Sequence, residues 1–354
     1  MRVIFEIEGR KIGPGLSPYV IAEISGNHGR KLSQAMQLID AANESGADAV
    51  KMQLFSADSM TLNSARPEFV VNRGVWRGRK VWDIFRETAT PVEWFPVLKA
   101  HAESTGIFFF FSVFDEFGLH VALDLGVPVV KIASNELTHL PLLDEVANSG
   151  LATILSTGGA RKHEILESVR YLVERTGSWV LPLYCVSAYP APLSLARLAS
   201  ITDLSQSLGL PVGFSDHTLG FKAAELSVGL GSVAIEKHIR LENDKSSPDA
   251  AFSASPEEFR TMVEAVRQAH QIVGLPAFGL SEEEENAPIW RRRFYAARDI
   301  RSGETIKPED LLTLRGPSGL PTSSAEAVSG AVARQEILRH TPIELEMLRT
   351  SQDA

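Results

Sequence analysis

Short apolar runs recur along the first 240 residues, and each is followed by a stretch whose apolar positions have helical spacing. Near-continuous apolar strands that alternate with helices are typical of a parallel sheet covered on both faces. We predict eight such strands, at 18–23, 48–55, 107–112, 127–134, 152–156, 180–186, 210–215 and 232–238. Eight β/α units close naturally into a (β/α)8 TIM barrel, although an open doubly wound sheet gives much the same pattern. The sequence contains neither a G-x-G-x-x-G fingerprint nor a P-loop that would favour the open sheet.

Two stretches interrupt this alternation. Segment 55–105 is longer than one connection needs and carries Trp76, Trp82 and Trp94, so we expect an insertion over the barrel mouth. The acidic run at 281–286 follows the last predicted helix and precedes arginine-rich sequence with short elements. We therefore predict a barrel domain over 1–280, a linker over 281–290 and a small C-terminal domain over 291–354.

Composition and charge narrow the functional classes. Hydrophobic residues make up 44% of the 354 residues and charged residues 22%, as in soluble globular proteins. The net charge of -9 argues against nucleic acid and anionic membranes as partners, because both require a basic face. No apolar run is long enough to span a bilayer, and the start lacks a signal-peptide core, so we expect a cytoplasmic protein. A single cysteine, Cys185, excludes an intrachain disulfide and disfavours a cysteine-based metal site.

Charged and imidazole side chains stand at the C-terminal ends of the predicted strands, where barrel enzymes build their sites. Because residues two apart share a face, the predicted pairs are Lys51 with Gln53, Ser215 with His217, and Glu236 with His238. The two histidines either bind one divalent ion or are half-buried, hydrogen-bonded histidines. Lys51 and Lys131 either bind a phosphate or carboxylate in the mouth or remain solvated. Lys237 lies on the opposite face from His238, and we expect it to pair with a helix outside the barrel.

Carboxylates and hydroxyls occupy similar positions. Glu23 ends the first strand and Glu136 follows the fourth, so either can act as an acid or base, with a structural ion pair as the alternative. Ser134, Ser156 and Ser215 stand at three strand ends, where their hydroxyls can donate to phosphate oxygens. These residues together predict a polar site at the barrel mouth.

Seven sequence blocks follow one another through the predicted barrel. They are VIAEISGNHG (20–29), GADAVKMQLF (46–55), KIASNEL (131–137), ILSTGGA (154–160), CVSAYPAP (185–192), GFSDHTLG (213–220) and EKHIRL (236–241). These blocks resemble the sialic acid synthase family, which condenses phosphoenolpyruvate with amino sugars. Segment 291–320 resembles the antifreeze-like (SAF, β-clip) domain that closes these synthases. ETATPVEWF (87–95) and Ser187 are similar to the pseudaminic acid synthase and spore coat polysaccharide branch.

The resemblance implies a reaction. Phosphoenolpyruvate would condense with an N-acetylmannosamine-like or diacetamido-trideoxyhexose aldehyde to give a nine-carbon nonulosonic acid and phosphate, for surface polysaccharide biosynthesis. His217 and His238 would bind a divalent metal, manganese, with magnesium or cobalt as alternatives, and Glu23 and Glu136 would transfer protons. The implied substrate-binding residues are Lys51, Gln53, Lys131, Ser134, Ser156, Ser187, Tyr189, Ser215, Asp249 and Arg315. Arg315 would reach the active site of the partner subunit in a domain-swapped homodimer.

Two other functions stay open, and three departures from the family pattern bear on specificity. A Schiff-base aldolase would use Lys51 or Lys131 as its amine nucleophile. A non-catalytic relative would retain only sugar or partner binding. Val113 stands where a small hydroxyl residue is usual, Gly316 interrupts the usual arginine-proline pair, and loop 242–253 lacks the glycine that usually precedes its proline-aspartate pair.

Overall fold

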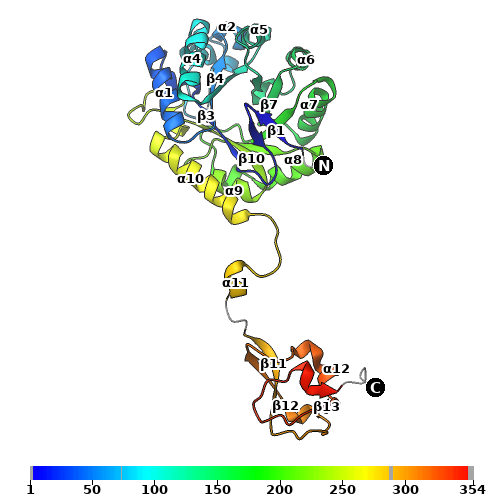
Figure 1. Ribbon diagram of the computed structural model, residues 1–354. Coiled ribbons are helices and arrows are strands. Elements are labelled where there is room, and N and C mark those ends of the chain that lie inside the picture. The colour runs from blue at the N-terminus through cyan, green and yellow to red at the C-terminus, as the bar shows by residue number, and fades with distance from the viewer. Residues whose placement is uncertain (1–2, 73, 287–289, 350–354) are drawn as a thin grey trace. The chain divides into compact units, whose positions relative to one another are not determined.

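Eight parallel strands form a closed barrel in the computed structural model, which describes residues 3–72, 74–286 and 290–349 (Figure 1). The strands are β3 (Tyr19–Glu23), β4 (Ala49–Leu54), β5 (Phe108–Val113), β6 (Val129–Ile132), β7 (Ala152–Ser156), β8 (Val180–Cys185), β9 (Val212–Asp216) and β10 (Ser232–His238). Each strand pairs with the next, and β10 pairs with β3 to close the barrel. The predicted TIM barrel is therefore confirmed, and the open sheet is wrong.

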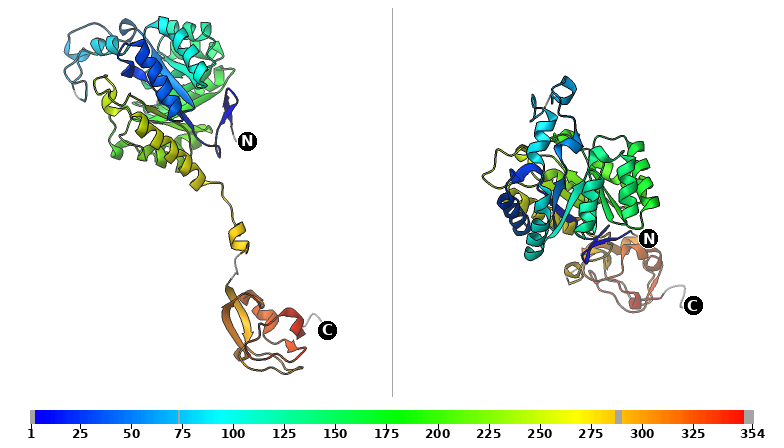
Figure 2. Two further views of the ribbon diagram at one scale, coloured as in Figure 1. Left: turned by 60° about the vertical axis from the view of Figure 1, so that its left-hand side comes forward. Right: turned by 90° about the horizontal axis from the view of Figure 1, so that it is seen from above.

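Helices cover the outside of the barrel, as Figures 1 and 2 show. They are α1 (Leu32–Glu44), α4 (Phe95–Thr105), α5 (Glu116–Asp124), α6 (Leu140–Ser149), α7 (Lys162–Arg175), α8 (Ala199–Leu208), α9 (Lys222–Gly229) and α10 (Pro256–Val273). A capping box starts α10, where Ser255 accepts from the Glu258 amide while the Glu258 carboxylate accepts from the Ser255 amide. This covering explains why the strands are buried on both faces, with only Gln53 and Tyr184 half-buried.

A hairpin that the sequence analysis did not anticipate precedes the barrel. It consists of β1 (Phe5–Ile7) and β2 (Arg10–Ile12), which pair in antiparallel register. The ring of Phe5 stacks on Trp179 with centroids 5.1 Å apart, and Trp179 directly precedes β8. Because β8 starts there, the hairpin lies at the N-terminal end of the barrel, opposite to the mouth.

The insertion between β4 and α4 lies over the mouth. It contains α2 (Ala57–Met60), η2 (Pro67–Phe69), α3 (Val81–Thr88) and η3 (Val92–Trp94). Met60, Trp76 and Phe85 from this segment line the cavity at the mouth. The predicted range of 55–105 is too long, because Trp94 packs against the main hydrophobic core and α4 is a regular barrel helix.

The chain divides into two compact units, Met1–Leu275 and Pro276–Ala354. The second unit contains α11 (Glu282–Asn286), β11 (Arg291–Ala296), η7 (Pro308–Asp310), β12 (Leu311–Gly316), η8 (Thr322–Ser324), α12 (Ala325–Val328), β13 (Val332–Ala333), η9 (Leu345–Met347) and β14 (Leu348–Arg349). Strands β11 and β12 pair in antiparallel register, as do β13 and β14. The second unit has its own hydrophobic core, which includes Phe294, Ile306 and Ile343.

The absence of a side chain at Gly316 has a steric reason within this second unit. A Cβ atom at this position would lie 1.6 Å from the hydroxyl oxygen of Tyr295. That hydroxyl donates to the carbonyl of Ser318 at 3.0 Å, so the tyrosine is held in place. Any residue with a side chain at 316 would therefore require Tyr295 to move, which explains why the residue between Arg315 and Pro317 is a glycine.

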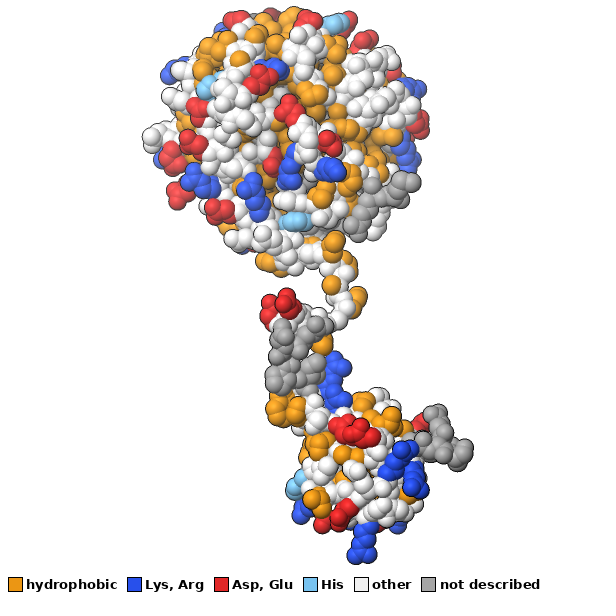
Figure 3. Space-filling view, in the orientation of Figure 1, with side chains coloured by type: hydrophobic (Ala, Val, Ile, Leu, Met, Phe, Trp, Pro, Cys, Tyr) orange, Lys and Arg blue, Asp and Glu red, His pale blue; other side chains and the backbone are white. Residues whose placement is uncertain are grey.

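The surface of the barrel unit is mixed in charge on the face drawn in Figure 3, where acidic and basic side chains are interspersed. The net charge of -9 is thus not gathered into one patch on that face. Within the described part of the chain, no helix combines the length and the apolar character needed to cross a membrane.

Candidate active site

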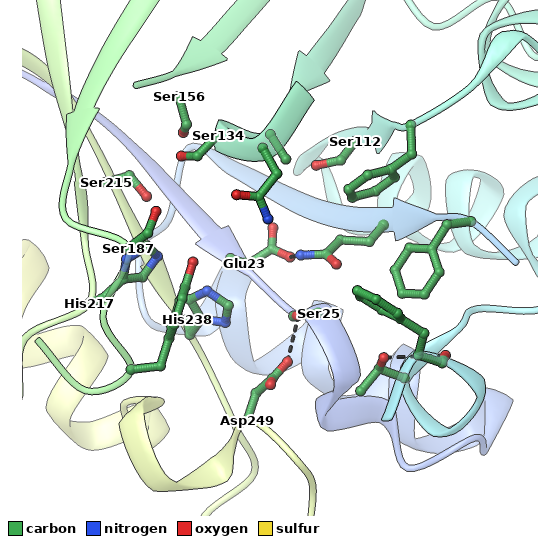
Figure 4. Close-up of a pocket in the computed structure, with 18 of the residues that line it drawn as sticks. Glu23, Ser25, Ser112, Ser134, Ser156, Ser187, Ser215, His217, His238 and Asp249 are labelled. Carbon is green, nitrogen blue, oxygen red and sulfur yellow. Dashed lines mark hydrogen bonds between the residues drawn. The ribbon is translucent and has the colours of Figure 1, made fainter. Parts of the chain in front are cut away.

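The mouth of the barrel holds a cavity of about 440 Å³. Every predicted site residue of the first unit lines it, namely Glu23, Lys51, Gln53, Lys131, Ser134, Glu136, Ser156, Ser187, Tyr189, Ser215, His217, His238 and Asp249. Figure 4 shows the labelled serines gathered around the space that Glu23 and His238 also face. Arg315 belongs to the second unit, where it lines a separate hollow of about 200 Å³ beside Tyr295. Its approach to the barrel mouth stays a prediction.

Two buried lysines anchor the polar side of the cavity. Lys51 Nζ lies 2.6 Å from Glu23 Oε2, and the Gln53 side-chain amide donates to Glu23 Oε1 at 2.9 Å. Lys131 Nζ donates to Ser156 Oγ at 2.6 Å. Burial disfavours the charge on Lys51, but the neighbouring carboxylates outweigh it, so the pKa of Lys51 is raised. Burial lowers the pKa of Lys131, and the charge of Lys51 adds to this effect.

Glu236 links these two lysines, although it was not among the predicted site residues. Its Oε2 lies 3.6 Å from Lys51 Nζ, its Oε1 lies 3.8 Å from Lys131 Nζ, and Ser215 donates to Oε1 at 2.9 Å. Burial raises the pKa of Glu236, but the two ammonium groups outweigh it and lower that pKa to about 2. Glu236 therefore stays ionised and offsets positive charge in the cavity. The sequence signal for Glu236 was its position two residues before His238, which places both side chains on the same face of the strand.

Strand β5 also contributes a group that the sequence analysis missed. Ser112 lines the cavity and accepts a hydrogen bond from Lys51 Nζ at 3.1 Å. Val113, in contrast, is fully buried in the hydrophobic core. Ser112 therefore places a hydroxyl in the cavity one residue before Val113, and its signal was the polar residue that ends the apolar run.

Gly158 gives several polar side chains room to converge. The Gly158 amide donates to Ser134 Oγ at 3.0 Å. A Cβ at position 158 would lie 2.3 Å from Ser187 Oγ and 2.7 Å from Cys185 Sγ. The missing side chain therefore leaves room for the hydroxyls of Ser134 and Ser187, and both line the same cavity as Lys131. Hydroxyl donors next to a buried lysine form a suitable cradle for a phosphate.

The two predicted metal ligands lie side by side, with ring centroids 5.5 Å apart. His217 Nδ1 lies 2.9 Å from the Val186 carbonyl, which can only accept, so Nδ1 carries the proton and Nε2 keeps its lone pair. His238 Nδ1 is buried and has no hydrogen-bond partner among the described residues. Burial lowers the pKa of both imidazoles, which favours the neutral form that binds metals.

These donors fit a divalent ion with an incomplete protein ligand set. Among the residues that the structure describes, no group of three or more histidine, cysteine, aspartate or glutamate side chains is arranged to hold a metal. Two neutral imidazoles suit manganese, cobalt or zinc and leave coordination positions open for water or substrate oxygens. Two imidazoles are fewer protein ligands than the three that catalytic zinc sites usually have, so an ion held here would need further ligands from water or substrate.

Glu136 lies at the end of η4 (Ser134–Glu136). Its Oε2 is buried and has no hydrogen-bond partner among the described residues. Burial raises the pKa of Glu136 to about 7. A carboxyl group with this pKa can both give and take a proton near neutral pH.

Asp249, just before η6 (Ala250–Phe252), ties two mouth loops together. Its Oδ2 accepts from Ser25 Oγ at 2.6 Å and from the Gly26 amide at 3.0 Å, both in η1 (Ser25–His28). A Cβ at Gly26 would lie 2.5 Å from the Thr88 methyl group, so the loop also packs closely against α3. Asp249 lines the cavity, and in this structure its hydrogen bonds go to the first mouth loop.

An aromatic group closes the side of the cavity beside the histidines. The ring of Tyr189 lies 4.4 Å from His217 and 5.1 Å from Phe252, centroid to centroid. Trp76 contacts both Tyr189 and Phe252, and its indole N–H donates to the Pro248 carbonyl at 2.9 Å. Trp76 is therefore a cavity residue of the insertion.

Lys237 requires a correction. It is buried, and its Nζ donates to Asp216 Oδ2 at 2.8 Å and to the Thr218 carbonyl at 2.6 Å. The expected pairing with a helix outside the barrel is wrong, because Asp216 at the end of the neighbouring strand β9 and Thr218, two residues after it, supply the partners. Strand parity alone cannot show which residue of an adjacent strand lies within reach.

This fold and this site define a class of TIM barrels. Their mouth combines buried lysines and serine hydroxyls with a pair of imidazoles, and the chain continues into a small β domain. The NeuB family model matches residues 38–277, and the SAF domain model matches residues 291–349. The chain belongs to the NeuB family and ends in a SAF domain, so the resemblance is confirmed.

Three relatives illustrate this membership. The chain is 34% identical over 319 residues to pseudaminic acid synthase of Campylobacter jejuni, covering 90% of this chain and 93% of that protein. It is 32% identical over 324 residues to N,N'-diacetyllegionaminic acid synthase of Legionella pneumophila, covering 90% and 91%. The crystal structure of N-acetylneuraminic acid (sialic acid) synthetase from Leptospira borgpetersenii matches with a TM-score of 0.73 and 29% identity, covering 80% and 95%.

Proposed function

We propose that this protein condenses phosphoenolpyruvate with the open-chain aldehyde of an N-acylated amino sugar, giving a nine-carbon nonulosonic acid and inorganic phosphate. One observation carries the proposal: a lysine-serine cradle, a carboxyl group that titrates near neutrality and a neutral imidazole pair line one cavity. The names of the relatives, synthases of pseudaminic and legionaminic acid, support the same reaction. They do not favour the Schiff-base aldolase or the non-catalytic alternative.

The cradle binds the donor in this proposal. Lys51, Lys131 and the surrounding serine hydroxyls hold the phosphate and carboxylate of phosphoenolpyruvate through charge-assisted hydrogen bonds. The methylene carbon of phosphoenolpyruvate bonds to the aldehyde carbon, water adds to the neighbouring carbon, and phosphate leaves as its carbon-oxygen bond breaks. Lys51 and Lys131 are then placed to stabilise the charge that develops on the departing phosphate.

The carboxyl groups move the protons. Glu136, protonated in part at neutral pH, gives a proton to the aldehyde oxygen as it becomes a hydroxyl. Glu23, held by Lys51 and Gln53, accepts a proton from the attacking water. Gln53, Tyr189 and Asp249 complete the surroundings of the acceptor sugar.

His217 and His238 hold a divalent ion in this proposal, with manganese as the expected ion and magnesium or cobalt as alternatives. When bound, such an ion supplies a Lewis acid that polarises the aldehyde carbonyl. His217 is oriented for this purpose by its Nδ1–H, which donates to the Val186 carbonyl and leaves Nε2 free.

The assembly and the location of the protein are also proposals. We expect a homodimer in which the SAF domain of one subunit brings Arg315 to the barrel of the other. Light scattering of the purified chain tests the dimer. The cytoplasmic location stays a prediction that cell fractionation tests.

The function is tested with phosphoenolpyruvate, manganese and a panel of acceptors. The panel contains N-acetylmannosamine, its 6-phosphate and a diacetamido-trideoxyhexose, and the readouts are released phosphate and product mass. We expect phosphate and a nine-carbon product in equal amounts with one acceptor, and loss of both after chelation of the metal. Turnover that survives complete metal removal would contradict the metal-dependent reaction, and no product with any acceptor would contradict the synthase.

A further inference from the structure

A buried ion pair lies behind the two histidines. Lys237 and Asp216 are 2% and 1% exposed, and each directly precedes one histidine, His238 or His217. Side chains alternate along a strand, so the ion pair points away from the cavity while the histidines point into it. The pair joins β9 to β10 at the last register position of their pairing, immediately before both histidines.

The hydrogen bonds of this pair fix the backbone of Thr218, the residue that follows His217. Lys237 Nζ bonds to Asp216 Oδ2 and to the Thr218 carbonyl, while Asp216 Oδ1 accepts from the Thr218 amide at 2.8 Å. The His217 carbonyl itself accepts from the Ala191 amide at 2.8 Å. The main chain of His217 and Thr218 is therefore held in place, and the lysine comes from the strand that carries the second imidazole.

From this geometry we infer that Lys237 and Asp216 are positioning residues, which set the separation and orientation of the His217 and His238 rings. The inference rests on the proposed metal site. Metal affinity depends on such outer contacts, because they fix the ligand directions before the ion binds. Neither residue lines the cavity, so neither is assigned a catalytic role.

Stability alone is a weak reason for this arrangement. Replacing a buried ion pair by neutral side chains of similar shape is often neutral or stabilising for folding, whereas removal of one partner leaves an unpaired buried charge. The double variant Lys237→Met with Asp216→Asn removes both charges, and an asparagine oxygen can still accept from the Thr218 amide. This variant therefore tests the effect of the ion pair on the histidine rings without leaving an unpaired buried charge that would destabilise the fold.

The test measures manganese binding to the full metal-free chain by calorimetry, together with its melting temperature. We expect the double variant to melt near the wild-type temperature and to bind manganese roughly 10- to 100-fold more weakly. Lys222→Met removes an exposed ion pair with Glu225 on α9 and serves as the matched control, with both readouts unchanged. Manganese affinity within twofold of wild type in the folded double variant would overturn the inference.

A second variant and a second readout cover the other outcomes. If the double variant does not fold, Lys237→Arg keeps the charge but changes the donor geometry, and weaker manganese binding is expected; unchanged binding would overturn the inference. If the wild type binds no manganese, the proposed metal site fails. Nitrogen-15 histidine NMR of the metal-free protein then decides, because the Nδ1–H signal of His217 is expected to shift in the variants, and an unshifted signal refutes positioning.

Discussion

Replacing Glu136 by glutamine is expected to stabilise the fold at neutral pH while it impairs the reaction. Burial raises the pKa of this carboxyl group from 4.5 to about 7. Between these two values the folded state binds more protons than the unfolded state, so the wild-type stability falls as the pH rises. A difference of 2.5 pKa units corresponds to about 3 kcal/mol, and the loss is complete once the pH exceeds about 7.

The glutamine variant has no proton to lose, so this pH dependence disappears from it. At pH 4, where the carboxyl is protonated in both states, wild type and Glu136→Gln are expected to have nearly equal free energies of unfolding. At pH 8 the variant should be more stable by about 3 kcal/mol. Urea unfolding followed by tryptophan fluorescence at both pH values measures the gap. Glu167→Gln, an exposed site on α7, controls for the loss of a surface carboxylate.

Activity gives the second half of this prediction. Loss of a positioned proton donor is expected to lower kcat roughly 10²- to 10⁴-fold. In the wild type, the rate should change with pH around the pKa of Glu136 near 7, and this limb should be absent from the residual activity of the variant. An equal difference in the free energy of unfolding between wild type and Glu136→Gln at pH 4 and pH 8 would refute the raised pKa of Glu136. An unchanged kcat of the variant would refute the role of Glu136 in proton transfer.

Three further predictions follow from other parts of the site. Gly158→Ala places a methyl group 2.3 Å from the Ser187 hydroxyl, so kcat/KM for phosphoenolpyruvate should fall on the order of 10²-fold. Gly177→Ala, at a position with open space around it, should leave kcat/KM unchanged. Equal kinetics of the two variants would argue against the cradle. Trp76→Ala should raise the KM for the acceptor about threefold to tenfold. Trp82→Ala serves as its control, because the Trp82 indole bonds to Asp58 outside the cavity. Equal KM values of the two variants would exclude a contact between Trp76 and the acceptor. Inactive Arg315→Ala subunits mixed with subunits that lack His217 and His238 should regain about a quarter of the wild-type activity if each SAF domain serves the barrel of the partner subunit. About half of the dimers are then mixed, and each mixed dimer has one complete site of two. No recovery of activity would contradict the exchange.

Strand positions and the candidate site could be predicted from the sequence to a large extent. The eight apolar runs coincide with the barrel strands, because strands covered by helices on the outside and by the barrel interior must be apolar along most of their length. The polar residues that end those runs line one cavity, because the strands of a parallel barrel open onto the same end. Lys51, Lys131 and His238 could therefore be named without coordinates.

The partners of these residues could not be predicted in the same way. Lys51 of β4 lies near Glu236 of β10 because β10 pairs with β3, which in turn pairs with β4. Lys237 pairs with Asp216 because the register of β9 and β10 places them opposite each other. The sequence by itself determined which side chains stand at the strand ends, since local apolar patterning sets each strand. Only the tertiary structure decided which charges neutralise one another, because barrel closure and strand register bring together residues that are far apart in the chain.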